Sequence, residues 1–79
     1  MKKYNLIFIK DGLLLSSKKY GSWREIQDEH ENYKASVEFD SLKEVIEYII
    51  MDYKLERVFA ENLIGRFIEN KYEIMPLDF

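Results

Sequence analysis

Residues 4–19 have the sequence YNLIFIKDGLLLSSKK, in which two apolar runs lie on either side of an Asp-Gly pair. The first run, Leu6 to Ile9, does not alternate with polar residues, which is typical of a strand covered on both faces. The Asp11-Gly12 pair suits a type I′ turn, because both central residues of that turn need positive φ. The stretch therefore predicts a β-hairpin with positive φ at Gly12, where a Gly12→Val substitution would lower stability.

A short helix and a third strand are predicted after the hairpin. Apolar and aromatic residues recur at helical spacing over residues 23–32, and Ser22 with Glu25 fits a capping box at the start of that helix. Residues 34–39 alternate, with Ala35, Val37 and Phe39 on one side. This alternation predicts a half-buried strand.

The second half of the chain predicts two helices and a last strand. Ser41 and Glu44 form a second capping box, and an apolar stripe follows at Leu42, Val45, Ile46, Ile49, Ile50 and Tyr53. A single helix over residues 42–69 would be about 40 Å long, which is too long for this domain. A break or a bend is therefore predicted near residues 52–55, with a second helix over about 55–69. Residues 71–75 have an extended pattern, which Pro76 is expected to end.

These elements predict one α+β domain over residues 1–79, with the order β-β-α-β-α-α-β. We expect a three- or four-stranded, mainly antiparallel sheet with helices packed on one face. Twelve aromatic residues, six Tyr, five Phe and one Trp, supply a core for so short a chain. The predicted core consists of Leu6, Phe8, Val37, Phe39, Ile46, Ile49 and Phe67.

Composition and charge exclude several classes of function. The absence of cysteine excludes disulfides, thiolate metal sites and a cysteine nucleophile, and favours a cytoplasmic location. No apolar run approaches the roughly 20 residues of a membrane span. The net charge of −3 is uneven: residues 1–20 carry +4, so the rest carries −3 − 4 = −7. The residue usage is typical of AT-rich coding, as in low-GC bacteria and their mobile elements.

The sequence indicates no catalytic residue, metal site or cofactor. His30 is the only imidazole, and it shares a helical face with Trp23 and Ile26, which favours a packed side chain. The glycines are single, so no phosphate-binding loop is present. Carboxylate pairs at helical spacing, such as Glu44 and Glu47, are typical of a solvated helix face. We therefore expect a protein that is not an enzyme.

A second apolar stripe indicates a surface for a partner protein. Tyr48 and Met51 lie away from the core stripe, and the same spacing continues to Leu55, Val58 and Phe59. A clean break would turn Leu55 and Phe59 inward and leave Tyr48 and Met51 partly exposed. The complete predicted surface consists of Tyr48, Met51, Leu55, Glu44, Glu47, Glu25, Asp28 and Glu29.

The favoured hypothesis is a protein–protein interaction module. Its most concrete form is a small inhibitor or adaptor, encoded by a phage or another mobile element. Its acidic helical layer would mimic nucleic-acid phosphates and block a basic cleft on a host or defence enzyme. A homodimer is a second possible use of the apolar stripe.

The alternative is a small regulatory protein that binds nucleic acid through the basic hairpin. The residues concerned are Lys2, Lys3, Lys10, Lys18, Lys19 and Tyr20. Lysines would neutralise phosphates and an aromatic ring would stack on a base. The acidic chain and its three arginines argue against this use, and lysine on an edge strand also guards against aggregation.

Overall fold

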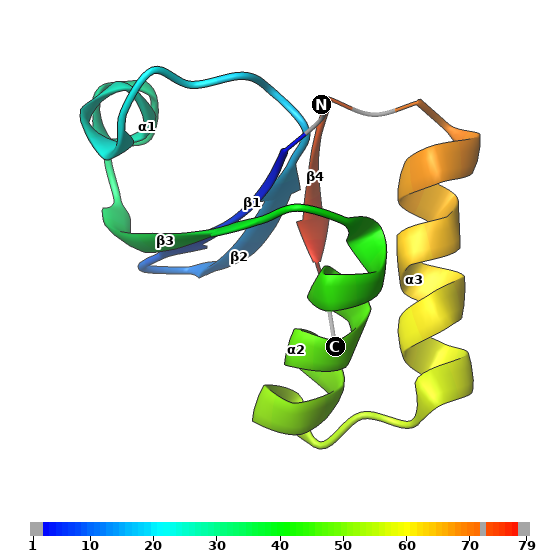
Figure 1. Ribbon diagram of the computed structural model, residues 1–79. Helices are drawn as coiled ribbons and strands as arrows, with labels where there is room; N and C mark the ends of the chain where they lie inside the picture. The colour runs from blue at the N-terminus through cyan, green and yellow to red at the C-terminus, as the bar shows by residue number, and fades with distance from the viewer. Residues whose placement is uncertain (1–2, 72, 78–79) are drawn as a thin grey trace.

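The computed structural model describes residues 3–71 and 73–77, and Figure 1 shows how the elements are arranged. The elements are β1 (Tyr4–Ile9), β2 (Gly12–Ser16), α1 (Trp23–Glu29), β3 (Tyr33–Phe39), α2 (Leu42–Tyr53), α3 (Arg57–Glu69) and β4 (Ile74–Leu77). Within these ranges, four strands form one antiparallel sheet with the order β3-β1-β2-β4. The predicted α+β class, element order and antiparallel sheet are confirmed.

The main core lies between one face of the sheet and the helices α2 and α3 (Figure 1). Leu6 of β1 pairs with Leu15 of β2 and with Val37 of β3, so these three residues point to the same face. The buried residues of this core are Leu6, Leu13, Leu15, Val45, Ile49, Ala60, Leu63, Ile64, Phe67, Met75 and Leu77.

The predicted core is largely confirmed. Leu6, Ile49 and Phe67 are at most 4% exposed. Three further predicted residues are partly buried against the same cluster: Phe8, Phe39 and Ile46. The prediction for Val37 is wrong, because its side chain is 37% exposed. The cause is the position of β3 at the edge of the sheet, where no neighbouring strand covers its outer side.

Helix α1 lies on the opposite side of the sheet from α2 and α3 (Figure 1). Ile7 and Ser16 point to this second face, and both are fully buried. A shallow hollow brings Ile26 of α1 beside Asn5 and Ser36, which point to the same face. The predicted packing of the helices on one face of the sheet therefore holds for α2 and α3. Helix α1 instead places its one buried side chain, Ile26, over the other face.

The predicted Ser and Glu pairs lie at the starts of α1 and α2, as a capping box in α1 and, in α2, with the Glu44 carboxylate bound to the N–H of Asp40 instead of the N–H of Ser41. The Glu25 carboxylate accepts hydrogen bonds from the backbone N–H groups of Gly21 and Ser22. In α2, Ser41 Oγ accepts from the Glu44 N–H at 3.3 Å, and the Glu44 carboxylate accepts from the Asp40 N–H at 2.9 Å. Each pair satisfies backbone donors that a helix start leaves without an intrahelical partner.

The end of α1 differs from the prediction, and the end of α2 agrees with it. α1 ends at Glu29 instead of 32, because His30 has extended backbone angles and Tyr33 already pairs with Ile9 in the sheet. α2 ends at Tyr53, where Lys54 adopts the left-handed conformation with φ 53° and ψ 44°. The chain therefore breaks near residues 52–55, as predicted, and α3 runs back alongside α2 (Figure 1).

The first hairpin is confirmed, but its predicted turn geometry is wrong. Ile9 pairs with Gly12, so Lys10 and Asp11 form the connection and Gly12 is already the first residue of β2. No described glycine has positive φ. A Cβ atom at Gly12 would meet nothing within 4 Å and φ is not positive there, so the backbone cause predicted for a clash in Gly12→Val is absent.

The β4 edge of the sheet carries a proline where a backbone donor would otherwise face outward. Successive residues of an antiparallel strand turn their backbone groups alternately toward each neighbour. The Ser17 N–H donates to the Glu73 carbonyl at 2.9 Å, so residues 73, 75 and 77 face β2. Pro76 therefore faces away from the sheet, where its missing N–H breaks no ladder bond. This position explains why Pro76 lies inside β4, contrary to the prediction that it would end the strand.

The β3 edge keeps its outward donors. The same alternation turns Gly12, Leu14 and Ser16 toward β1, and turns Tyr4, Leu6 and Phe8 of β1 toward β3. The residues of β3 that pair with them, Phe39, Val37 and Ala35, turn their backbone groups toward β1. The backbone N–H and C=O groups of Ser36 and Glu38 consequently point out of the sheet. An irregularity between Phe8 and Ile9 limits the regular part of this edge to residues 35–39.

Candidate interaction surfaces

The predicted apolar partner surface does not form one patch. The Tyr48 ring lies 5.3 Å from the Phe39 ring and 6.5 Å from the Phe8 ring, both in edge-to-face geometry. Leu55 packs against the core, whereas Met51 is 77% exposed. Tyr48 is only about 100° round the helix from Ile49, so its long side chain reaches β3, although it stays partly exposed as predicted. Met51 therefore projects from α2 without Tyr48 or Leu55 beside it.

The predicted acidic residues are divided between two sides of the sheet. Glu44 and Glu47 lie on α2, and Glu25, Asp28 and Glu29 lie on α1. Glu25 and Glu44 cap their helices, as described above. Glu47 bonds to Arg57 at 2.9 Å and Glu29 bonds to Lys18 at 2.9 Å. The hydrogen bond from Arg57 lowers the pKa of Glu47.

The open edge of β3 is a candidate surface that the sequence did not reveal. Trp23 is 55% exposed and lies beside Ser36 and Glu38 on the α1 side of this edge. Val37 is exposed on the α2 side. An exposed apolar side chain thus lies on each face of the sheet: Trp23 in a hollow that Ser36 and Glu38 also line, and Val37 on β3 itself. The sequence pattern predicted Val37 as a core residue, because local periodicity does not show which strand occupies an edge.

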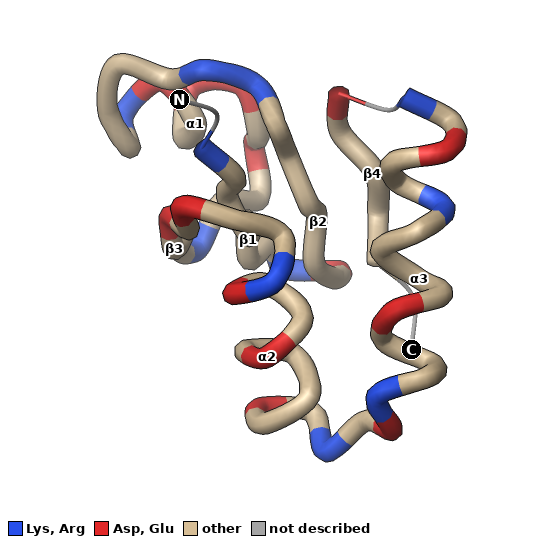
Figure 2. The backbone as a smooth tube through the Cα atoms, turned by 45° about the vertical axis from the view of Figure 1, so that its right-hand side comes forward, with Lys and Arg blue, Asp and Glu red and all other residues tan. Residues whose placement is uncertain are grey.

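The segment that contains the β3 edge is acidic, although its carboxylates lie on both sides of the sheet and three of them pair with Lys3, Lys18 and Arg57. Residues 23–53, which include α1, β3 and α2, contain three basic and nine acidic residues, giving 3 − 9 = −6. Figure 2 shows the acidic positions along these elements and the basic positions of the connection between β2 and α1. A protein that docks at the β3 edge would therefore meet a negative potential.

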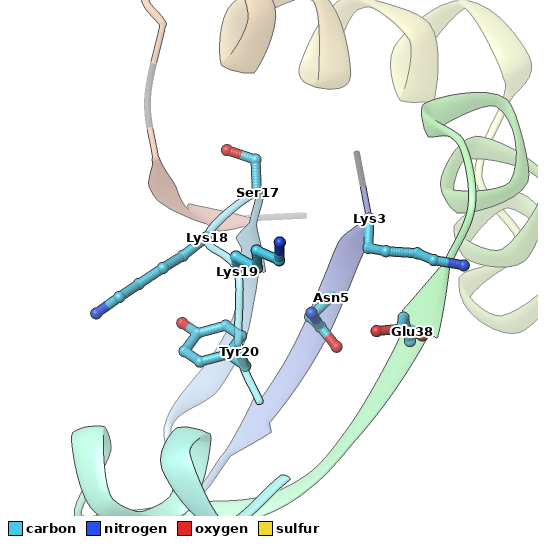
Figure 3. A pocket seen from close by; sticks show the side chains of 7 residues that line it. All are labelled: Lys3, Asn5, Ser17, Lys18, Lys19, Tyr20 and Glu38. Atoms are coloured by element: carbon cyan, nitrogen blue, oxygen red, sulfur yellow. The ribbon is translucent and has the colours of Figure 1, made fainter. Parts of the chain in front are cut away.

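Four residues of the predicted nucleic-acid set line one hollow of about 310 Å³ (Figure 3). The complete lining consists of Lys3, Asn5, Ser17, Lys18, Lys19, Tyr20 and Glu38. Lys10 lies at the hairpin turn, at the other end of β1, and Lys2 lies outside the described residues. The structure thus brings together Lys3, Lys18, Lys19 and Tyr20 but separates Lys10 from them.

Two of these lysines form exposed ion pairs. Lys3 bonds to Asp40, and Lys18 bonds to Glu29 at 2.9 Å. These hydrogen bonds raise the pKa values of both lysines. Figure 3 shows the Lys3 and Lys18 side chains extending away from the centre of the hollow, toward opposite sides.

Asn5 and Tyr20 form the polar interior of the hollow. Asn5 is only 6% exposed, and no hydrogen bond joins its amide to any residue in the described ranges. Tyr20 Oη lies 3.2 Å from Ser16 Oγ, which also accepts from the Lys18 N–H at 3.1 Å. Burial raises the pKa of Tyr20. These contacts hold the connection after β2 against the sheet, with the Asn5 amide below it.

His30 is partly buried, as its helical face predicted, and its Nε2 atom is buried without a partner in the described part of the chain. Among residues 3–71 and 73–77, no group of three or more His, Asp or Glu side chains could hold a metal ion. No helix in the same ranges is long and apolar enough to cross a membrane. Comparisons with protein-family models, curated proteins and solved structures find no match for this chain.

Proposed function

We propose that this chain is a cytoplasmic, non-enzymatic protein-interaction module, an inhibitor or adaptor that binds its partner along the open edge of β3. The observation that carries this proposal is the difference between the two sheet edges. Pro76 blocks the outer side of β4, whereas Ser36 and Glu38 leave backbone donors and acceptors uncovered on β3. An extended segment of the partner adds to such an edge as a further strand.

Side chains beside this edge supply the apolar part of the interface. Trp23 on one face and exposed Val37 on the other are placed to contact alternate side chains of the added strand. Tryptophan is among the residues that contribute most to binding when a partner buries it. The Cζ atom of Arg24 lies 5.5 Å from the centroid of the Trp23 ring, so the guanidinium lies over this ring in the free protein.

Charge indicates the chemistry of the partner. The net charge of −6 over residues 23–53 favours a partner surface rich in lysine and arginine. Enzymes that handle nucleic acid carry such surfaces, because they neutralise phosphates. An inhibitor that presents carboxylates beside the β3 edge would occupy that surface in place of nucleic acid. This supports a nucleic-acid-handling enzyme as the target.

The test compares two exposed apolar residues at different places. The partner is first identified by affinity capture, and binding is then measured by calorimetry with both proteins purified. Trp23→Ala should weaken binding at least tenfold, which corresponds to about 1.4 kcal/mol. Met51→Ala removes a more exposed side chain from α2 and should leave the affinity unchanged. Equal affinities for all three proteins would contradict the proposal.

A backbone variant tests the strand-addition step separately. Ser36→Pro removes an N–H that points out of the sheet, so the ladder with β1 keeps its bonds. Binding should be lost while circular dichroism and the thermal unfolding midpoint stay close to those of the wild type. If the proline prevents folding, the Trp23→Ala and Met51→Ala comparison still decides whether the partner docks at this edge.

A further inference from the structure

The Asn5 amide is an unusual group to find at the base of an open hollow. Asn5 is 6% exposed as a residue and makes no side-chain hydrogen bond to a described residue, and its amide atoms are not among the fully buried ones, so the amide reaches the open space of the hollow. Buried polar side chains in native proteins nearly always have a hydrogen-bond partner. Figure 3 shows Asn5 between Tyr20 and Glu38, facing the space that these residues line. Water satisfies this accessible amide in the free protein, and a ligand in this space would take over those hydrogen bonds.

Lysine residues give the rim of this hollow affinity for an anion. The lining of the hollow contains three lysines and one carboxylate, that of Glu38. The formal charge of the lining is therefore 3 − 1 = +2. Lys19 is exposed, and no ion pair joins it to a described residue. The pairs of Lys3 with Asp40 and of Lys18 with Glu29 are solvent-exposed, and exposed pairs of this kind are weak. Lys19 can therefore bind a phosphate, and the other two lysines can turn toward it.

The walls suit a planar ring that carries donors and acceptors. An asparagine amide donates and accepts side by side, which matches the edge of a nucleobase. The Tyr20 ring forms one wall and offers a surface for stacking. The Glu38 carboxylate can accept from a base amino group or a ribose hydroxyl. The volume of about 310 Å³ lies at the lower end of small-ligand sites.

We propose that this hollow binds a nucleotide, with the base against Asn5 and Tyr20 and the phosphate on Lys19 and Lys3. The nucleotide is either free or one unit of a single strand of nucleic acid. This activity goes beyond the protein-binding function proposed above, because it uses Asn5, Tyr20 and the lysines, although the neighbouring surfaces share Glu38. Trp23 does not line this hollow.

The experiment is an NMR titration of the isotope-labelled chain with three probes: AMP, a short oligothymidylate and inorganic phosphate. Saturable shifts of the Asn5 side-chain amide and of the Tyr20 signals are expected with AMP or the oligothymidylate. Inorganic phosphate should bind at least about tenfold more weakly, because it leaves Asn5 without a partner. Tighter binding of the oligothymidylate than of AMP indicates single-stranded nucleic acid, and the reverse order indicates a free nucleotide.

Matched variants separate this site from a general attraction of charge. Lys19→Gln should weaken binding several-fold, whereas Lys10→Gln removes the same charge from the other end of β1 and should have no effect. Asn5→Leu should weaken binding about tenfold or more. If Asn5→Leu does not fold, the Lys19 and Lys10 pair still tests the site. The proposal is overturned if no probe shifts Asn5, or if both lysine variants weaken binding equally.

The two proposals can fail independently. Trp23→Ala should leave nucleotide binding unchanged, and Lys19→Gln should leave strand addition at β3 unchanged apart from small charge effects. Loss of partner binding in Trp23→Ala with normal nucleotide shifts would support both surfaces. A chain that binds its protein partner but shifts with no nucleotide would retain the proposed function and exclude the nucleotide site.

Discussion

The ring of Tyr48 on α2 packs edge-to-face against the ring of Phe39 on β3, with centroids 5.3 Å apart and planes at 61°. This geometry brings the positive edge of one ring to the negative face of the other. The contact joins the middle of α2 to the last residue of the edge strand. Tyr48 therefore supports the β3 edge from beneath and does not belong to a separate outer surface.

Exchanging Tyr48 and Met51 for serine should have very different effects on stability. Tyr48→Ser removes the contacts with Phe39 and Phe8 and should lower the free energy of unfolding by about 2 kcal/mol. Met51→Ser should change it by less than about 0.5 kcal/mol, because Met51 is largely exposed. Urea denaturation of both variants measures the difference. Equal losses would show that Met51 is also packed.

Two glycines provide a matched pair for backbone effects. A Cβ atom at Gly12 has free space and φ is not positive there, so Gly12→Ala should leave stability unchanged or raise it slightly. A Cβ atom at Gly21 would meet the Glu25 carboxylate, which caps α1. Gly21→Ala should therefore cost about 0.5–1 kcal/mol through the disturbed cap. Thermal unfolding of both variants measures these effects, and a larger loss at Gly12 would contradict the turn geometry described above.

The ion pair between Glu47 and Arg57 should be visible in the titration of Glu47. The hydrogen bond from Arg57 lowers the pKa of Glu47 in the folded protein. A lowered pKa contributes stability above the pKa of the unfolded chain, and this contribution is lost as the pH falls through the folded value. Arg57→Gln should raise the Glu47 midpoint in an NMR titration of the side-chain carboxyl. High salt should also raise the titration midpoint of Glu47, because salt screens an exposed ion pair.

His30 offers a test of an unsatisfied polar atom. Its Nε2 is buried without a hydrogen-bond partner among the described residues. His30→Leu removes this atom while keeping a similar volume, so the free energy of unfolding should rise by about 1 kcal/mol. His30→Gln keeps a polar group at the same place and should give no such gain. Chemical denaturation compares the three proteins, and a loss in His30→Leu would indicate a hidden polar contact.

Local sequence patterns were sufficient for most of the fold. The capping pairs of Ser22 and Ser41 depend on residues three positions apart, so the sequence alone locates both helix starts. The change of phase near Tyr53 similarly located the break between α2 and α3. The turn at Lys10-Asp11 was misplaced by one residue, because strand register depends on pairing along the whole hairpin.

The surfaces were harder to predict because they depend on contacts between distant residues. Nothing near Val37 indicates that β3 lies at the edge of the sheet, or that Trp23 lies across from it on the other face. Tyr48 stays partly exposed as predicted, but its contact with Phe39 of β3 was not predicted. The lysines around Tyr20 were named from the sequence, but Asn5 was not, because only the sheet shows that this residue lies at the base of the hollow.

Helix α1 has seven residues, of which only Ile26 is buried. Detachment of α1 alone from the sheet would remove few apolar contacts. It should therefore cost far less free energy than unfolding of the whole chain. In the opened form Ile7, which is fully buried in the closed form, would meet water. The amide protons of α1 should therefore exchange with deuterium well before those of α2. The two faces of one sheet would then open on separate timescales, one through local fluctuation and the other only through global unfolding.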